Sequence, residues 1–141
     1  MTNGFTIVRD IAASPERVWA AFTDASQYAA WIWPADWQTQ CDIEARVGGS
    51  FHVASQPKGM DVHGTYVAVD PFTHLALTWR WHDQTDESLV TIDLEPTADG
   101  TKLTLTHENF VSEESRAAHE RGWNDCLDRL PAYVSGAEVV A

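Results

Sequence analysis

The chain has 141 residues, of which 44% are hydrophobic and 21% charged, and its 9 basic and 21 acidic residues give a net charge of −12. This length and composition predict one globular domain spanning residues 1–141 and exclude a disordered chain. The negative charge argues against nucleic acid and anionic membrane surfaces as partners, because both present phosphates that an acidic protein repels.

The start of the chain and its cysteines predict a cytoplasmic protein. The opening MTNGFTIVRD lacks the basic region and apolar run of a signal peptide, and no later stretch approaches the ~20 apolar residues of a membrane span. Cys41 and Cys126 lie far apart, on a predicted strand and a predicted helix, without a CxxC or Cys/His spacing. Two largely buried free thiols in a reducing compartment fit this pattern better than a disulfide.

One strand and two short helices are predicted near the N-terminus. Residues 5–11 alternate apolar and polar side chains, as expected for a strand. Ser14 is a suitable N-cap for the first helix, and Pro15 fits its first turn, where a missing N–H costs nothing. A second helix is expected over 26–31. Pro34 ends it, because the residue before a proline disfavours helical geometry.

From residue 38 onward the apolar pattern has the period of two that indicates strands. Short links separate the predicted strands, so neighbours should pair as an antiparallel meander. Residues 112–134 then have the spacing of one long amphipathic helix. We therefore expect an α+β fold, in which a strongly curved antiparallel sheet wraps around the long C-terminal helix. The predicted strands cover 39–47, 50–56, 61–70, 73–82, 87–96 and 101–109.

The late strands and the last helix predict a pocket with apolar walls and a few polar groups. Alternation along each strand places its large side chains on one face, and helical spacing aligns a second set along one side of the helix. A sheet that curls around this helix would enclose a space between the two sets. The candidate pocket residues are Trp79, Trp81, Leu105, His107, His119, Trp123 and Leu127.

Each of these residue types has a second interpretation. The seven tryptophans can form an aromatic ligand wall or fill the core of a small domain. Trp31, Trp33 and Trp37 lie in a loop-rich segment that could form a pocket lid or a protein contact. His107 and His119 can act as general acid or base, or can be hydrogen-bonded core histidines. No histidine–carboxylate spacing suits a metal, and neither a serine nucleophile motif nor a phosphate loop is present.

Eight short motifs resemble a known family. The resemblance is to the START/Bet v 1-like (helix-grip) superfamily, and within it to stand-alone proteins related to the C-terminal domain of the Hsp90 ATPase activator. It extends from residue 9 to about residue 134, in the expected order. Ile32 departs from the family pattern, which often has a tryptophan there. The motifs are 13–19 (ASPERVW), 31–34 (WIWP), 46–51 (RVGGSF), 64–66 (GTY), 70–71 (DP), 77–79 (LTW), 103–107 (LTLTH) and 119–123 (HERGW).

The resemblance implies a helix-grip fold with a deep cavity that relatives use to hold hydrophobic small molecules. It implies no single activity, because members of the superfamily include carriers, receptors, cyclases and co-chaperone domains. We expect a cofactor-free domain that binds a small hydrophobic or aromatic ligand. One alternative is a cyclase- or dehydratase-like enzyme that uses an inward histidine. The other is a protein-interaction domain, in which an exposed patch over 31–37 would form a homodimer.

Overall fold

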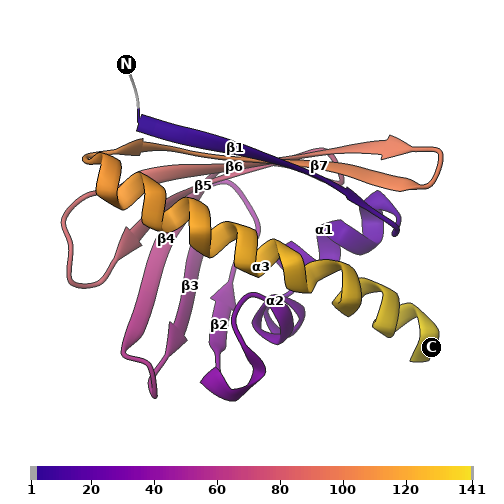
Figure 1. Cartoon of the computed structure of the whole chain (residues 1–141), viewed down its shortest axis with the longest axis horizontal. Helices are drawn as coiled ribbons and strands as arrows, with labels where there is room; N and C mark the ends of the chain where they lie inside the picture. The colour runs from indigo at the N-terminus through magenta and orange to yellow at the C-terminus, as the bar shows by residue number, and fades with distance from the viewer. Residues whose placement is uncertain (1–2, 141) are drawn as a thin grey trace.

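A seven-stranded antiparallel sheet curves around one long helix, which confirms the predicted α+β, helix-grip fold (Figure 1). The computed structural model describes residues 3–140, and the side chains of residues 4–134. The elements are β1 (Asn3–Ile11), α1 (Pro15–Thr23), α2 (Ala25–Trp31), the 3₁₀ turn η1 (Ala35–Trp37), β2 (Gln40–Ile43), β3 (Ser50–Ser55), β4 (Met60–Asp70), β5 (His74–Trp81), β6 (Ser88–Thr97), β7 (Gly100–Phe110) and α3 (Glu113–Val140). The strand order is β1-β7-β6-β5-β4-β3-β2, so strands β2 to β7 form a meander and β1 joins its edge beside β7.

The two short helices begin with side-chain caps. Ser14 caps α1 as predicted, since its Oγ accepts the Arg17 N–H at 3.1 Å. Helix α2 begins one residue earlier than predicted, and Asp24 is its N-cap. The Asp24 carboxylate accepts the backbone N–H groups of Ser26 and Gln27 at 3.0 and 3.3 Å. A carboxylate suits this position because it also interacts with the positive end of the helix.

The second strand is shorter than predicted, because the chain turns sharply after β2. The prediction of a strand over 39–47 is wrong beyond residue 43, where a turn leads into β3. Two glycines make the turn feasible. Gly48 has a φ of +84°, and a Cβ on Gly49 would lie 2.0 Å from the carbonyl oxygen of Glu44. Alternation of side chains does not reveal such a close approach of one backbone to another.

Helix α3 lies across the concave face of the sheet, with α1 and α2 beside its C-terminal half (Figure 1). It begins after Ser112, whose Oγ accepts the Ser115 N–H at 3.1 Å, and it continues past the predicted end to Val140. Pro131 lies inside the helix and removes one backbone hydrogen bond. The core lies between helix and sheet, and its fully buried members include Val53, Val62, Leu103, Leu105, Leu127, Leu130 and Val134. Among residues 3–140, none of the helices has both the length and the apolar character needed to cross a membrane.

Candidate functional site

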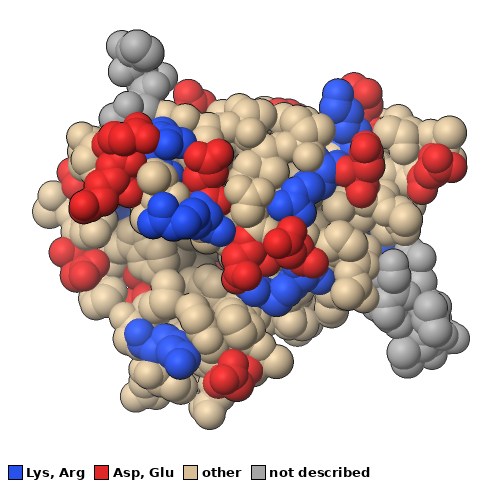
Figure 2. All heavy atoms as spheres, viewed as in Figure 1, with Lys and Arg blue, Asp and Glu red and all other residues tan. Residues whose placement is uncertain are grey.

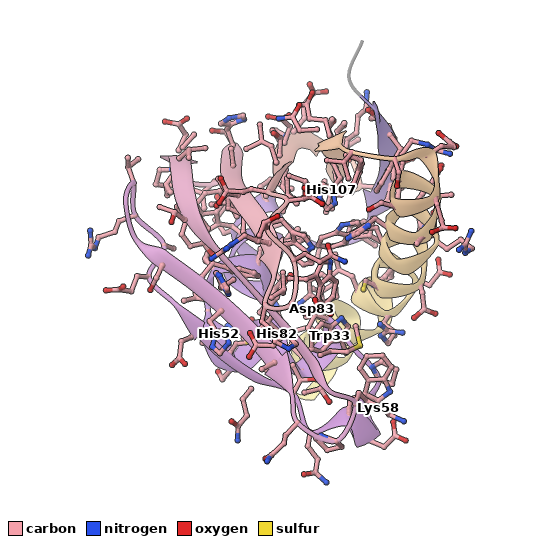
Figure 3. The ribbon with its side chains drawn as sticks, turned by 90° about the vertical axis from the view of Figure 1, so that its left-hand side faces the viewer. Trp33, His52, Lys58, His82, Asp83 and His107 are labelled. Carbon is pink, nitrogen blue, oxygen red and sulfur yellow. The ribbon has the colours of Figure 1, made fainter. Side chains whose placement is uncertain are left out.

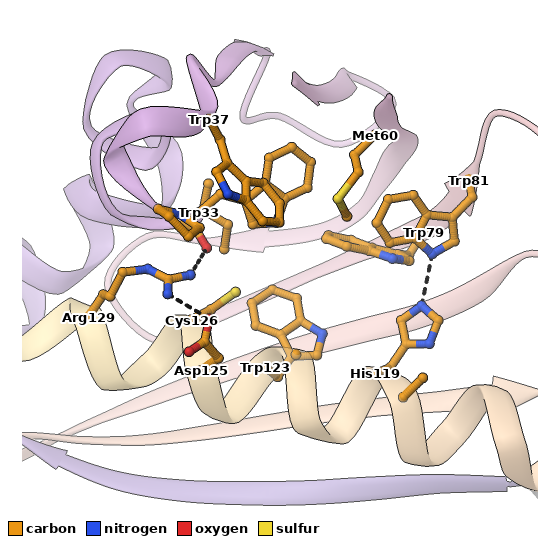
Figure 4. A pocket seen from close by; sticks show the side chains of 14 residues that line it. Trp33, Trp37, Met60, Trp79, Trp81, His119, Trp123, Asp125, Cys126 and Arg129 are labelled. Atoms are coloured by element: carbon orange, nitrogen blue, oxygen red, sulfur yellow. Dashed lines mark hydrogen bonds and ion pairs between the residues drawn. The ribbon is translucent and has the colours of Figure 1, made fainter. Parts of the chain in front are cut away.

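A cavity of about 280 Å³ opens between α3, the end of β5 and the segment that joins α2 to β2 (Figure 4). Its walls are mostly apolar, and five of the seven tryptophans of the chain line it. They are Trp33, Trp37, Trp79, Trp81 and Trp123, and Ile32, Pro34 and Met60 complete the apolar lining. This is the concave, aromatic type of site that small molecules occupy in proteins.

Two hydrogen-bonded contacts hold the segment that forms one wall of the cavity. Arg129 of α3 donates to the carbonyl oxygens of Trp31 and Ile32, at 3.0 and 2.7 Å, where α2 ends. A guanidinium suits this place, because the last carbonyls of a helix lack partners within the helix and carry its negative end. Farther along, buried Ser55 of β3 donates its hydroxyl to the carbonyl oxygen of Trp37 at 2.6 Å. The wall is therefore tied to both the helix and the sheet.

The structure brings together only some of the predicted pocket residues. Trp79 and Trp81 of β5 line the cavity, as do His119 and Trp123 of α3. The other three, Leu105, His107 and Leu127, are fully buried in the core and do not line it. They share a face with the lining residues, but other side chains fill the space in front of them.

The tryptophans of the α2–β2 segment have different roles. Trp31 is not part of a lid: its side chain is 1% exposed, and its indole N–H donates to the Ala21 carbonyl oxygen at 2.9 Å. Trp33 and Trp37 form the cavity wall. Met60 and Gly122 also line the cavity and were not predicted. Gly122 lies three residues after His119 on α3, so the helical pattern could have indicated it, whereas Met60 at the start of β4 carries no such signal.

His107 is the centre of a buried hydrogen-bond chain beneath the cavity. The Trp123 indole N–H donates to His107 Nδ1 at 3.0 Å, so the ring proton must be on Nε2. Nε2 lies 2.6 Å from the Ser88 hydroxyl and donates to it, and Ser88 donates in turn to the Trp79 carbonyl oxygen at 3.2 Å. Both ring nitrogens therefore have partners inside the protein.

Burial makes His107 a neutral, structural group. Loss of solvent, and to a smaller extent the neighbouring His119, lowers the pKa of His107 to about 2. An imidazole with so low a pKa remains unprotonated near neutral pH and is a very weak base. Figure 3 places His107 between the sheet and α3, away from His52 on the outside of the sheet.

His119 links α3 to the cavity wall. Its Nε2 accepts the Trp81 indole N–H at 2.9 Å (Figure 4), and its Nδ1 donates to the Ser115 carbonyl oxygen at 2.8 Å. Partial burial lowers the pKa of His119, although the hydrogen bond to Ser115 opposes this effect. The neutral ring thus holds Trp81 against the helix.

The Trp79 indole nitrogen is different from those of its neighbours. Trp79 is 5% exposed, and its Nε1 is enclosed without a hydrogen-bond partner among the residues that the structure describes. Nearly all buried donors in folded proteins have a partner, and buried tryptophans usually follow this rule. The cavity wall therefore contains an enclosed donor that no described residue satisfies.

Cys126 also lines the cavity, but it does not form a reactive thiol site. Both cysteines are free, as predicted, and burial raises the pKa of Cys41 and of Cys126 to about 12. Only the thiolate is a strong nucleophile, and a thiol with this pKa holds almost none near neutral pH.

The remaining histidines with resolved side-chain contacts each pair separately. His52 lies 2.8 Å from Asp61, and His74 lies 2.6 Å from Asp93. His63 accepts from Arg80 at 2.9 Å. Within the described part of the chain, no three histidine, cysteine or carboxylate side chains are grouped as a metal site requires.

A second hollow of about 300 Å³ lies outside the sheet. Its lining is largely polar and includes Gln38, Gln56, Asp61 and His82. These side chains are wholly or partly exposed to water, so a ligand there would gain little from desolvation. The apolar cavity beside α3 is the better candidate site.

The surface over α3 carries charges of both signs in alternation (Figure 2). Arg116 pairs with Glu113 and Glu120, and Arg129 pairs with Asp125 at 2.6 Å beside the cavity. Most of these partners are well exposed, so the pairs contribute little to stability. The pair with Asp125 neutralises the charge of Arg129 at the edge of the cavity.

Comparison with known proteins agrees with this architecture. A family model described as activator of Hsp90 ATPase homolog 1-like protein matches residues 12–135. The chain belongs to this family. Proteins with the fold of these Hsp90 ATPase activator homolog 1-like proteins commonly bind hydrophobic ligands. No curated protein matches the chain.

Several solved structures are similar to this family member. A protein from Chromobacterium violaceum is 28% identical with a TM-score of 0.80, and the match covers 94% of this chain and 97% of that one. A protein from Rhizobium loti is also 28% identical, with a TM-score of 0.78 and the same coverage of 94% and 97%. CalU16 from Micromonospora echinospora is 26% identical with a TM-score of 0.75, over 96% of this chain and 78% of that one.

Proposed function

We propose that this protein binds a small hydrophobic or aromatic ligand in the cavity between β5 and α3. The observation that carries the proposal is the lining of five tryptophans around a space of about 280 Å³. Aromatic side chains expose large apolar surfaces, and a ligand that covers them gains roughly 25 cal/mol per Å² removed from water. The volume is near the lower end of ligand sites, which favours a molecule of one or two rings.

The contacts of the histidines favour binding rather than catalysis. His107 lies beneath the cavity lining with both nitrogens occupied by Trp123 and Ser88. His119 reaches the cavity, but Trp81 and Ser115 occupy its two nitrogens. A general acid or base needs a nitrogen that is free to reach the reacting group, so neither ring is arranged for acid–base catalysis.

The location of the tryptophans argues against a protein-interaction surface on the 31–37 segment. Trp31 and Trp33 are buried, and Trp37 is half-buried against Trp33 at a ring distance of 5.5 Å. An exposed apolar patch is the usual feature of an interaction site, and these rings face inward instead.

Gly122 offers a way to close the cavity without weakening the fold. It lies on the exposed side of α3 at the cavity, and a Cβ there would meet no atom within 4 Å. Gly122→Leu places a branched side chain in the opening, whereas Gly122→Ala adds only a methyl group. Both should keep or raise stability, by up to about 1 kcal/mol, because glycine is a poor helix former.

Native mass spectrometry after incubation with a cell extract tests the proposal. We expect adducts of small-molecule mass on the natural protein and on Gly122→Ala. Gly122→Leu should carry at least about fivefold less adduct than the natural protein, because the leucine side chain occupies part of the cavity. Masses of the bare chain alone, or equal adducts on both variants, would contradict the proposal.

A further inference from the structure

The enclosed Trp79 N–H lacks the hydrogen-bond partner that three nearby indoles have. The N–H of Trp81 donates to His119, that of Trp123 to His107, and that of Trp31 to Ala21. Trp79 Nε1 is enclosed and has no such partner within the described residues. In Figure 4 the Trp79 ring lies edge-on between Trp81 and Trp123, in the wall of the cavity.

We infer that the ligand carries a neutral hydrogen-bond acceptor that pairs with the Trp79 indole N–H. This inference rests on the proposed function, because it concerns the chemistry of the molecule in the same cavity. A carbonyl or ether oxygen on an aromatic body has the required properties. Its rings would cover the apolar walls, and its oxygen would satisfy the donor that the protein leaves free.

The charges near the cavity favour a neutral acceptor over a carboxylate. Asp125 lies in the lining, and it already pairs with Arg129, the lining residue that could attract an anion. The chain as a whole has a net charge of −12. An anionic ligand would lose its hydration in an apolar space whose lining cation, Arg129, is already paired.

Access to Trp79 Nε1 requires a movement of one neighbouring ring. Four rings pack around Trp79; those of Phe51, His107 and Trp123 are buried, whereas Trp81 is partly exposed. Its indole is held by a single hydrogen bond, to His119. Rotation of Trp81 is therefore the least costly way for a ligand oxygen to reach the Trp79 N–H.

A matched pair of probes tests the inference directly. 2-Acetylnaphthalene and 2-isopropenylnaphthalene have nearly the same shape, but only the first has an acceptor oxygen. By titration calorimetry the natural protein should bind the ketone about threefold to tenfold more tightly than the alkene. In Trp79→Phe, which keeps an aromatic ring and lacks the N–H, the ratio should fall to about one.

Trp123→Phe is the matched control, because the N–H that it removes already donates to His107. We expect weaker binding of both probes and an unchanged preference for the ketone. A second measurement uses only the natural protein, so it tests the inference even if Trp79→Phe folds poorly. In the ¹⁵N-labelled natural protein, the ketone alone should move the Trp79 indole proton downfield.

The outcomes separate the two hypotheses. Equal affinity of the natural protein for both probes would overturn the acceptor inference and leave the proposed function intact. The same holds if Trp79→Phe keeps the preference, or if the Trp79 N–H turns out to face the ring of Trp81 and its signal does not respond. Failure of both probes to bind would count against the inference and against the proposed function together.

Discussion

Replacement of His107 by leucine is expected to lower the free energy of unfolding by about 2–5 kcal/mol. The two side chains are similar in size, so the loss comes mainly from hydrogen bonding. Leucine would leave the buried Trp123 N–H without its acceptor and the Ser88 hydroxyl without the His107 N–H. Urea denaturation at pH 7.5, where the histidine is neutral, measures the difference.

The same substitution at an exposed histidine is the control. His74 contacts Asp93 on the outer face of the sheet, and its side chain is 36% exposed. His74→Leu should change stability by less than about 1 kcal/mol, because water replaces the lost contact. Equal losses of unfolding free energy at the two positions would mean that the buried hydrogen bonds of His107 stabilise the fold no more than the exposed contact of His74 does.

The pH dependence of the His107→Leu difference gives an independent check. The pKa of His107 is about 2 in the folded protein and near 6.5 in the unfolded chain. The unfolded state therefore binds the extra proton first, and His107 contributes less stability as the pH falls below 6.5. The gap between the natural protein and His107→Leu should shrink by about 2 kcal/mol between pH 7 and pH 5. A constant gap would show that His107 titrates normally in the folded state.

Gly64→Ala is expected to destabilise the protein by more than about 3 kcal/mol, or to prevent folding. A Cβ on Gly64 of β4 would lie 1.8 Å from the carbonyl oxygen of Thr78 and 2.7 Å from its carbonyl carbon. Both atoms belong to the backbone of β5, so relief of the clash requires the two strands to separate. Thr78 immediately precedes Trp79, and the change would therefore also disturb the cavity wall.

Gly59→Ala provides the comparison for this second prediction. Gly59 has a φ of +63°, and a Cβ there would meet no atom within 4 Å. Alanine should cost about 1–2 kcal/mol, because only the left-handed backbone conformation opposes it. Thermal unfolding followed by circular dichroism compares the two variants. Similar melting temperatures would contradict the close approach of β4 to β5.

Much of the fold follows from periodicity in the sequence. Alternation in the last strand correctly predicts that Leu103, Leu105 and His107 share a buried face, and helical spacing predicts the same for Leu127 and Leu130. The family motifs lead to the same architecture. Such patterns report which face of an element is turned inward, because apolar side chains leave the water whether they fill a core or line a cavity.

Periodicity does not report whether an inward face meets other side chains or an open space. Leu127 and Trp123 lie on the same side of α3, yet only Trp123 lines the cavity. The difference depends on side chains from distant segments, such as Trp33 and Met60, whose positions no local pattern contains. The hydrogen-bond partners of His107 and the unpartnered state of Trp79 are likewise tertiary features, visible only once β5, β7 and α3 are assembled.

The central claim, that a small ligand occupies the tryptophan-lined cavity, is tested most directly by the seven indole N–H signals in a ¹H–¹⁵N NMR spectrum. The signals of Trp19 and Trp31, which do not line the cavity, serve as internal controls. On titration with 2-acetylnaphthalene we expect the other five to shift and these two to stay in place. Unchanged cavity signals, or shifts confined to Trp19 and Trp31, would contradict the claim.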